Sequence, residues 1–385
     1  MDEVGPGAPS GRLVSIDALR GLAALGVVAF HAGLAGAYFG APGLGGRVLA
    51  FVASFGGAGV WLFFVISGFC IHLRWAKARA SGQAARVDFL EFWRRRIRRL
   101  YPPYLVALAA YVAVLAVEGR LAPSPFSAFD VGMHLLMLHN LDGRTVFTLN
   151  GVFWTLAIEE QLYLAYFLLL RLRARWGWPA TIGCCLAARA AWFALALVVH
   201  RVFGAKILVT EAAAPQWFIW ALGALSVEAA LGLVRLPPWT RSGWLAVGGV
   251  GAAGAVSYAL RVADPAGGLA KLLWLVGDPL WGIAFFVVVN AAVGLERRWT
   301  LGRAPGLVGL LAAVGFFSYS LYLTHELVLA HAVAWIRPGL PFVVGAVIFS
   351  ALSVAVARAF FQVFERPFLS RAAVSPGPGV APVPS

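Results

Sequence analysis

The sequence predicts an all-α, polytopic membrane protein with about ten transmembrane helices. Hydrophobic residues make up 61% of its 385 positions and charged residues only 12%, whereas charged residues make up about 25% of an average soluble domain. Apolar runs of about 20 residues, the length that crosses a bilayer, recur along the whole chain. The composition therefore excludes an ordinary soluble domain.

The apolar runs define the predicted transmembrane helices in chain order. We expect them at about residues 14–36, 53–75, 101–119, 149–170, 179–200, 215–234, 242–260, 271–294, 307–335 and 341–363. An even number of crossings puts both ends of the chain on the same side of the membrane. Residues 1–13 and the Pro-rich residues 371–385 are expected to be disordered tails, and residues 14–370 to form one transmembrane domain.

Basic residues determine the predicted orientation. The connection between the second and third runs is dense in basic side chains, namely Arg74, Lys77, Arg79, Arg86, Arg94, Arg95, Arg96, Arg98 and Arg99. Short loops rich in Lys and Arg stay in the cytoplasm, so both termini are expected there. Because the basic residues lie beside apolar segments, this topology accounts for the net charge of +14, and no nucleic-acid partner is expected.

The first run contains two ionisable side chains that point to an internal site. Arg20 and His31 are eleven residues apart, so at 100° per residue they project from one face of a helix, about 16 Å apart along its axis. An arginine at bilayer depth costs roughly 2.5 to 3.5 kcal/mol, so such residues usually face the interior of a helix bundle. The alternatives are that Arg20 reaches the headgroups and that His31 is an ordinary core histidine.

An arginine cluster follows the second run. Residues 87–100 place apolar side chains at helical spacing opposite an arginine face, so we expect an interfacial helix there. Arg95, Arg96 and Arg99 lie at the expected cytoplasmic opening, and guanidinium groups bind phosphate in a bidentate manner. The cluster predicts a phosphate site or, alternatively, a topology anchor that binds anionic lipid.

Polar and small residues interrupt two further runs. Ser67 and Gly68 leave room for a thin acyl or pantetheine chain, or they let two helices approach closely. Glu159 and Tyr163 are four residues apart and share one helix face. An ion pair within the bundle and a role in binding the acceptor are both open for Glu159.

The ninth run contains a polar stripe. Ser318, Tyr322 and His325 fall on one helix face, which predicts either a hydrogen-bonded helix contact or one wall of the cavity that His31 faces. We expect no metal centre, because the histidines show no ligand spacing. The three cysteines lie in apolar runs without a framework pattern, at Cys70, Cys184 and Cys185.

Together these segments resemble the acyltransferase 3 family of integral-membrane acyltransferases. The matching motifs occur in the family's order and cover nearly the whole chain. They are Asp17-Ala-Leu-Arg20-Gly21 with His31, Phe63-Phe64-Val-Ile-Ser67-Gly68-Phe69, Arg95-Arg96-Ile-Arg-Arg99-Leu-Tyr101-Pro102, Trp154-Thr-Leu-Ala-Ile-Glu159 with Tyr163, Ser318-Tyr319-Ser-Leu-Tyr322-Leu-Thr-His325 and Glu365-Arg366-Pro367. The fused SGNH-type hydrolase domain of larger members is not expected here.

The resemblance implies an enzyme that moves an acyl group, commonly acetyl, from cytoplasmic acyl-CoA to a hydroxyl of a carbohydrate or glycosylated acceptor. Its expected place is the inner membrane of a bacterial cell, with the acceptor at the outer face. Family members without the fused hydrolase domain act on exported glycans, lipid-linked sugars and antibiotics, so a secondary metabolite is an alternative acceptor. A transporter or flippase of a lipid-linked sugar is the competing function, and a homo-oligomer is left open.

The resemblance also suggests a role for each site residue. His31 is expected to act as general base on the acceptor hydroxyl or, alternatively, to form an acyl-histidine intermediate. Tyr319 or His325 is expected to stabilise the developing oxyanion. Arg20 is expected to hold the donor, and Glu159 to orient a neighbour. The acyl-CoA donor is expected to bind along Arg95, Arg96, Arg99, Ser67, Gly68 and Arg20.

Overall fold

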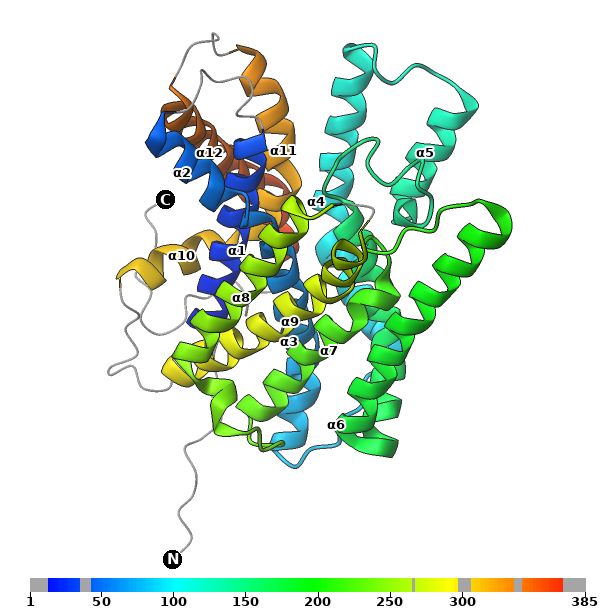
Figure 1. The fold of residues 1–385 in the computed structure, drawn as a ribbon, viewed down its shortest axis with the longest axis vertical. Helices are drawn as coiled ribbons and strands as arrows, with labels where there is room; N and C mark the ends of the chain where they lie inside the picture. The colour runs from blue at the N-terminus through cyan, green and yellow to red at the C-terminus, as the bar shows by residue number, and fades with distance from the viewer. Residues whose placement is uncertain (1–12, 35–42, 265–266, 297–305, 336–340, 370–385) are drawn as a thin grey trace, which may run out of the picture.

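The computed structural model describes residues 13–34, 43–264, 267–296, 306–335 and 341–369. Every element within these ranges is a helix, which confirms the predicted all-α class (Figure 1). The predicted tails lie outside the described residues, except for Leu13. The helices longer than five residues are α1 (Val14–Leu34), α2 (Leu44–Ala53), α3 (Gly59–Ala80), α4 (Phe89–Val117), α5 (Pro125–Leu135), α6 (Trp154–Phe203), α7 (Ala213–Ala230), α8 (Gly243–Val262), α9 (Gly268–Glu296), α10 (Gly306–Phe316), α11 (Ser318–Trp335) and α12 (Phe342–Phe360).

Among the described residues, seven helices are long and apolar enough to cross a membrane, or eight if the bent pair of α10 and α11 forms one span. The sequence predicts about ten crossings. The difference arises at α6 and α7. α6 runs as one helix through two predicted crossings, and α7, which carries Gln216 and Glu228, is not among the seven.

A kink in the 50-residue helix α6 takes the place of the loop that the sequence predicts there. The backbone of Gly177 adopts φ 74° and ψ −179°, a non-helical conformation that glycine tolerates because it has no Cβ. Pro179 follows and has no N–H to continue the helical hydrogen bonds. The two parts of α6 on either side of this kink coincide with the predicted crossings 149–170 and 179–200.

The predicted interfacial helix 87–100 and the predicted crossing that follows it form one continuous helix, α4. The helix begins after Asp88, whose side chain accepts a 2.7 Å hydrogen bond from the Glu91 N–H, and it continues through Pro102 and Pro103. The arginine cluster and the membrane-crossing part of α4 therefore belong to one continuous helix.

The bent pair α10 and α11 brings the predicted polar stripe next to α1. The two helices meet at 74°, where the sequence predicts one straight crossing. α10 packs closely on α1, since a Cβ on Gly315 would lie 1.8 Å from the carbonyl oxygen of Asp17. A Cβ on Gly21 would lie 2.0 Å from the carbonyl oxygen of Leu311. This contact depends on glycine at both positions and leaves α11 against α1 as well.

A second close contact joins α3 to α7, which is buried along almost its whole length. A Cβ on Gly68 would lie 1.9 Å from the carbonyl oxygen of Trp220, and one on Gly223 would lie 1.8 Å from that of Val65. Backbones approach this closely only where side chains are absent. α7 is thus an internal helix that supports α3, the helix that carries Ser67.

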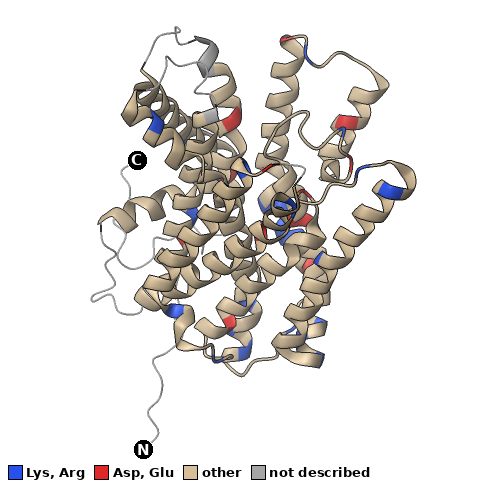
Figure 2. Cartoon of the chain, in the orientation of Figure 1, with Lys and Arg blue, Asp and Glu red and all other residues tan. Residues whose placement is uncertain are grey.

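Charged residues gather in a few places on this scaffold (Figure 2). Several basic segments lie at the end of the molecule where α3 ends and α6 is kinked, which is the end that the predicted topology places in the cytoplasm. Basic and acidic segments also lie together in the middle of the molecule, where tan ribbon surrounds them.

Candidate active site

Side chains from α1, α3, α4, α6 and α11 surround a cavity that contains three arginines. Arg20 comes from α1, and Arg96 and Arg99 come from α4. We call this space, of about 110 Å³, the arginine cavity. Its other lining residues include Val60, Phe63, Ser67, Cys70, Thr155, Glu159, Tyr163, Ser318, Tyr319 and Tyr322.

The arginine cavity has the composition of an anion site. Guanidinium groups stay charged and offer forked donors that match phosphate oxygens. The guanidinium carbon of Arg96 lies 5.5 Å from the Phe92 ring centroid and 5.9 Å from that of Tyr163, and its Nε atom is buried without a partner. Arg95 is not among the lining residues; it pairs with Glu91 one turn earlier on the exposed side of α4.

Glu159 lies on the wall of the arginine cavity at the end of a short hydrogen-bond chain. The Ser67 hydroxyl donates to Oε1 of Glu159 over 2.5 Å, and the Trp220 indole N–H donates to the Ser67 oxygen over 3.2 Å. The two small residues of α3 are therefore placed differently. Ser67 lines the cavity, whereas Gly68 packs against the α7 backbone and is not among the lining residues.

His31 lines a second and larger space, of about 350 Å³, which we call the histidine cavity. Three indole rings stand on its wall, from Trp61, Trp154 and Trp281. Arg261 adds a cation to the same wall. The cavity therefore combines flat apolar surfaces with a few polar groups, as small-molecule sites usually do.

The two cavities adjoin at Val60 of α3 and Tyr322 of α11, which line both of them. The three arginines lie on one side of this boundary and His31 on the other. The face shared by Arg20 and His31 in the sequence thus reaches both cavities.

The hydrogen bonds around His31 assign its tautomer. Nδ1 of His31 lies 2.9 Å from the carbonyl oxygen of Val27, so Nδ1 carries the proton and donates it. Nδ1 of His325 lies 3.1 Å and 2.9 Å from the carbonyl oxygens of Leu321 and Tyr322, so it also donates. Nε2 of His325 then lies 3.3 Å from Nδ1 of His31 and accepts the longer branch of a hydrogen bond that this N–H shares with Val27. This arrangement leaves Nε2 of His31 with its lone pair, as a general base requires.

Tyr319 and His325, the two residues expected to stabilise an oxyanion, both donate their hydrogen bonds to backbone carbonyl oxygens. The Tyr319 hydroxyl lines the arginine cavity but donates to the carbonyl oxygen of Leu100 over 2.9 Å. His325 donates from Nδ1 to the backbone, and its Nε2 is an acceptor toward His31. In this geometry His325 orients the His31 ring, and the Tyr319 hydroxyl must release the Leu100 carbonyl oxygen before it can donate elsewhere.

A buried network around Glu228 was not singled out from the sequence. Its carboxylate accepts from Arg173 over 2.6 Å and from the Trp178 indole over 3.0 Å, and it lies 2.9 Å from Nε2 of His72. The signal that was available is a pair of ionisable residues, His72 and Glu228, inside apolar runs. The network joins α3, α6 and α7 and stands apart from the residues that line the two cavities.

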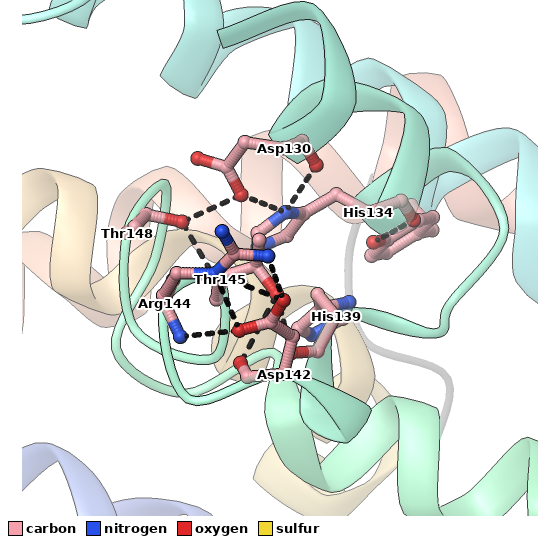
Figure 3. A network of polar contacts seen from close by, with 8 residues as sticks. Asp130, His134, His139, Asp142, Arg144, Thr145 and Thr148 are labelled. Atoms are coloured by element: carbon pink, nitrogen blue, oxygen red, sulfur yellow. Dashed lines mark hydrogen bonds and ion pairs between the residues drawn. The ribbon is translucent and has the colours of Figure 1, made fainter. Parts of the chain in front are cut away.

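A second group that the sequence did not reveal lies between α4 and α6 (Figure 3). The rings of His134 and His139 stack with centroids 3.9 Å apart and planes 6° apart, and Oδ1 of Asp130 lies 3.2 Å from Nδ1 of His134. Burial, with the neighbouring His134 ring, lowers the pKa of His139 to about 3, and burial also lowers the pKa of His134. Across the described ranges, no group of three or more His, Cys, Asp or Glu side chains is arranged for a metal ion.

Helices long and apolar enough to cross a membrane, with an arginine-lined cavity beside a histidine-lined one between them, define a class of protein, an integral-membrane protein with an internal site in its described residues. The family model described as an acyltransferase domain matches residues 13–361. The chain therefore belongs to the acyltransferase 3 family and is an acyltransferase.

Relatives in three bacterial species agree with this assignment. Acyltransferase MdmB of Streptomyces mycarofaciens is 27% identical over 339 residues, which are 83% of this chain and 80% of that protein. O-acetyltransferase OatA of Staphylococcus aureus is 30% identical over 176 residues, or 42% of this chain and 26% of its own. Peptidoglycan O-acetyltransferase OatA of Listeria monocytogenes is 29% identical over 175 residues, and this alignment covers 42% of this chain and 25% of that protein. The match thus spans about a quarter of each OatA protein, and no solved structure matches this chain.

Proposed function

We propose that the protein transfers an acyl group, with acetyl as the first candidate, from acyl-CoA to a hydroxyl of a carbohydrate or glycosylated acceptor. The observation that carries the proposal is the junction of the two cavities, with Arg20, Arg96 and Arg99 on one side and His31 on the other. A polyanionic thioester suits the first cavity and a hydroxyl acceptor suits the second. Their reacting atoms meet where the cavities adjoin.

The donor is proposed to bind with its phosphates on Arg96 and Arg99, at the end of the cavity that belongs to α4. Its pantetheine arm passes Arg20, Ser67 and Glu159. Arg20 and His31 are about 16 Å apart along α1, so the part of the donor beyond Arg20 extends over at most about that distance toward His31. In this account Arg95 contributes only to the charge of the surface, and Gly68 acts by letting α3 approach α7.

The transfer step uses Nε2 of His31. This atom takes the proton of the acceptor hydroxyl as the oxygen attacks the thioester carbonyl carbon, so a C–O bond forms and the C–S bond breaks. The electron pair of the C–S bond leaves with the coenzyme A sulfur, and the proton passes from His31 to that thiolate. The products are the acylated acceptor and coenzyme A. Attack by Nε2 itself, to give an acyl-histidine, is the alternative route.

The acceptor is proposed to lie in the histidine cavity. The faces of Trp61, Trp154 and Trp281 suit the apolar faces of sugar rings, and Arg261 supplies a polar contact. The name of the Listeria relative, a peptidoglycan O-acetyltransferase, supports a carbohydrate acceptor. In this proposal the enzyme works in the bacterial inner membrane, receives the donor from the cytoplasm and has both termini there.

Binding of acetyl-CoA to the detergent-purified protein tests the donor half of the proposal. Replacing Arg96 and Arg99 together by Gln removes two charge-assisted contacts, so we expect the affinity for acetyl-CoA to fall about 100-fold or more. Arg95→Gln is the matched control because its side chain pairs with Glu91 outside the cavity, and it is expected to leave the affinity nearly unchanged. Equal affinities for the wild type and the double variant would refute the proposed donor site.

A further inference from the structure

Val60 and Tyr322 occupy the one place that both cavities share. Of the residues that line the arginine cavity, these are the two that also line the histidine cavity. Both belong to the same apolar cluster between α3, α4, α6 and α11. We refer to the pair as the neck.

The ring of Tyr322 is held at the neck from both sides. Its hydroxyl lies 2.6 Å from Oγ1 of Thr155, which lines the arginine cavity, and it donates to the carbonyl oxygen of Val152, which lines the histidine cavity, over 3.0 Å. The ring centroid lies 5.9 Å from that of Phe63 and 5.8 Å from that of His325. Tyr322 is 7% exposed, and its side chain cannot swing out of the neck without breaking these contacts.

We propose that Val60 and Tyr322 select the acyl group by its size. This inference rests on the proposed function, because it assumes a thioester whose phosphates lie on Arg96 and Arg99. To be attacked by a hydroxyl held at His31, the thioester carbonyl carbon has to reach the neck. The remainder of the acyl group then lies between the Val60 side chain and the Tyr322 ring.

Val60 and Tyr322 take no part in the bonds made and broken during the transfer. Their proposed effect is on which acyl group fits at the neck. The bonds made and broken are those of the transfer step above, a C–O bond formed and a C–S bond broken. Because the Tyr322 ring is fixed by Thr155 and Val152, the space beside Val60 limits the chain. Hydrophobic sites discriminate between groups that differ by one methylene by about 10-fold to 200-fold.

The test compares acetyl-, propionyl- and butyryl-CoA on the full-length protein in detergent. The first readout is the rate of thioester hydrolysis, with water in place of the acceptor, and competition against labelled acetyl-CoA gives a second readout that needs no turnover. Val60→Ala widens the neck and Val60→Ile fills it. Val65→Ala makes the same change as Val60→Ala at a buried position of α3 that lines neither cavity.

We expect Val60→Ala to raise the preference for butyryl over acetyl about tenfold, and Val60→Ile to lower the preference for propionyl by a similar factor. Tyr322→Phe keeps the ring but removes its hydroxyl contacts, and it should loosen selectivity in the same direction as Val60→Ala. Val65→Ala should leave the chain-length profile as in the wild type, whatever its effect on yield.

If both Val60 variants keep the wild-type chain-length profile and still bind and hydrolyse acetyl-CoA, size selection by the neck is refuted. The proposed function would not be affected by that result. Failure of the wild type to bind any acyl-CoA would instead refute the proposed function, and the neck with it. A shift of Val65→Ala equal to that of Val60→Ala would also overturn the neck, because the effect would then come from helix packing.

Discussion

Nε2 of His325 accepts a hydrogen bond from Nδ1 of His31 over 3.3 Å, and the two ring centroids are 5.0 Å apart. The pair joins α11 to α1. Because His325 is itself held by two backbone carbonyl oxygens, it helps to fix the ring plane of His31, whose tautomer is also set by the Val27 carbonyl oxygen. His325 is therefore a positioning residue for the proposed base.

Replacing His325 by Phe tests this relationship, since the ring volume stays and the acceptor is lost. A base displaced by about 1 Å can cost about 100-fold in rate, so we expect the rate of acetyl-CoA hydrolysis to fall by up to that factor. The affinity for acetyl-CoA should stay the same, because His325 is not among the residues that line either cavity. His325→Gln, which keeps an acceptor oxygen, should restore part of the rate; loss of donor affinity in both variants would contradict a positioning role.

Cys70 offers a direct report on the donor site. It is partly exposed and lines the arginine cavity, whereas Cys184 and Cys185 of α6 do not. Coenzyme A bound in the cavity should therefore protect Cys70 from alkylation by a maleimide, as measured by mass spectrometry of each site. Cys184 is the internal control and should react equally with and without coenzyme A. Protection of Cys70 should disappear when Arg96 and Arg99 are replaced by Gln, and its persistence there would contradict the proposed phosphate contacts.

Ser67→Ala should destabilise the protein as well as the site. The substitution removes the donor to Glu159 and the acceptor of the Trp220 N–H. Hydrogen bonds to charged groups contribute about 1.5–3 kcal/mol, so the free energy of unfolding should fall by about that amount. Thermal unfolding in detergent measures the loss. Ser353→Ala is the control for removing a hydroxyl that makes no contact, because Ser353 is fully buried and its hydroxyl has no partner, whereas Ser67 is partly buried; similar losses in both variants would show that the Ser67 contacts contribute little.

The stacked histidines in Figure 3 predict how stability depends on pH. The pKa of His139 is lowered to about 3 by burial and by His134, while an unfolded histidine titrates near 6.5. The unfolded chain therefore binds more protons, so the stabilisation is fully present above about pH 6.5 and is lost as the pH falls from there toward 3, at up to about 1.4 kcal/mol per pH unit. Limited proteolysis of residues 119–148 between pH 7.5 and 5 measures this loss. His139→Phe keeps the stacked ring and should make cleavage less dependent on pH; an equally steep dependence would assign it to other groups.

Much of the fold was predictable because bilayer thickness dictates the length of apolar runs. Helices were expected at every run of crossing length, whereas the shorter helices α2 and α5 were not expected. The bends in the helices were not predictable, because hydropathy gives no information on the direction of a helix axis. The kink at Gly177 and the 74° break before Ser318 depend on packing against other helices, and so does the burial of α7 behind α3. The interfacial helix and the crossing that follows it were separated between residues 100 and 101, whereas α4 is continuous there and runs on through Pro102 and Pro103.

The candidate site was predictable where helix geometry alone decides. The spacing of Arg20 and His31 places both on one face, and the structure brings that face to two adjoining cavities. Neighbouring arginines were not distinguishable, since Arg95 and Arg96 differ by 100° and only the packing of α4 decides which one points inward. The packing role of Gly68 likewise depends on α7, a helix far away in sequence.

The measurement that tests the account most directly compares the wild type with His31→Ala for both acetyl-CoA binding and thioester hydrolysis in detergent. We expect binding to be unchanged, since the proposed phosphate contacts lie in the other cavity, and hydrolysis to fall by about 100-fold or more, as for loss of a general base. Hydrolysis that continues in His31→Ala at the wild-type rate, with acetyl-CoA bound, would contradict the assignment of His31 as the base.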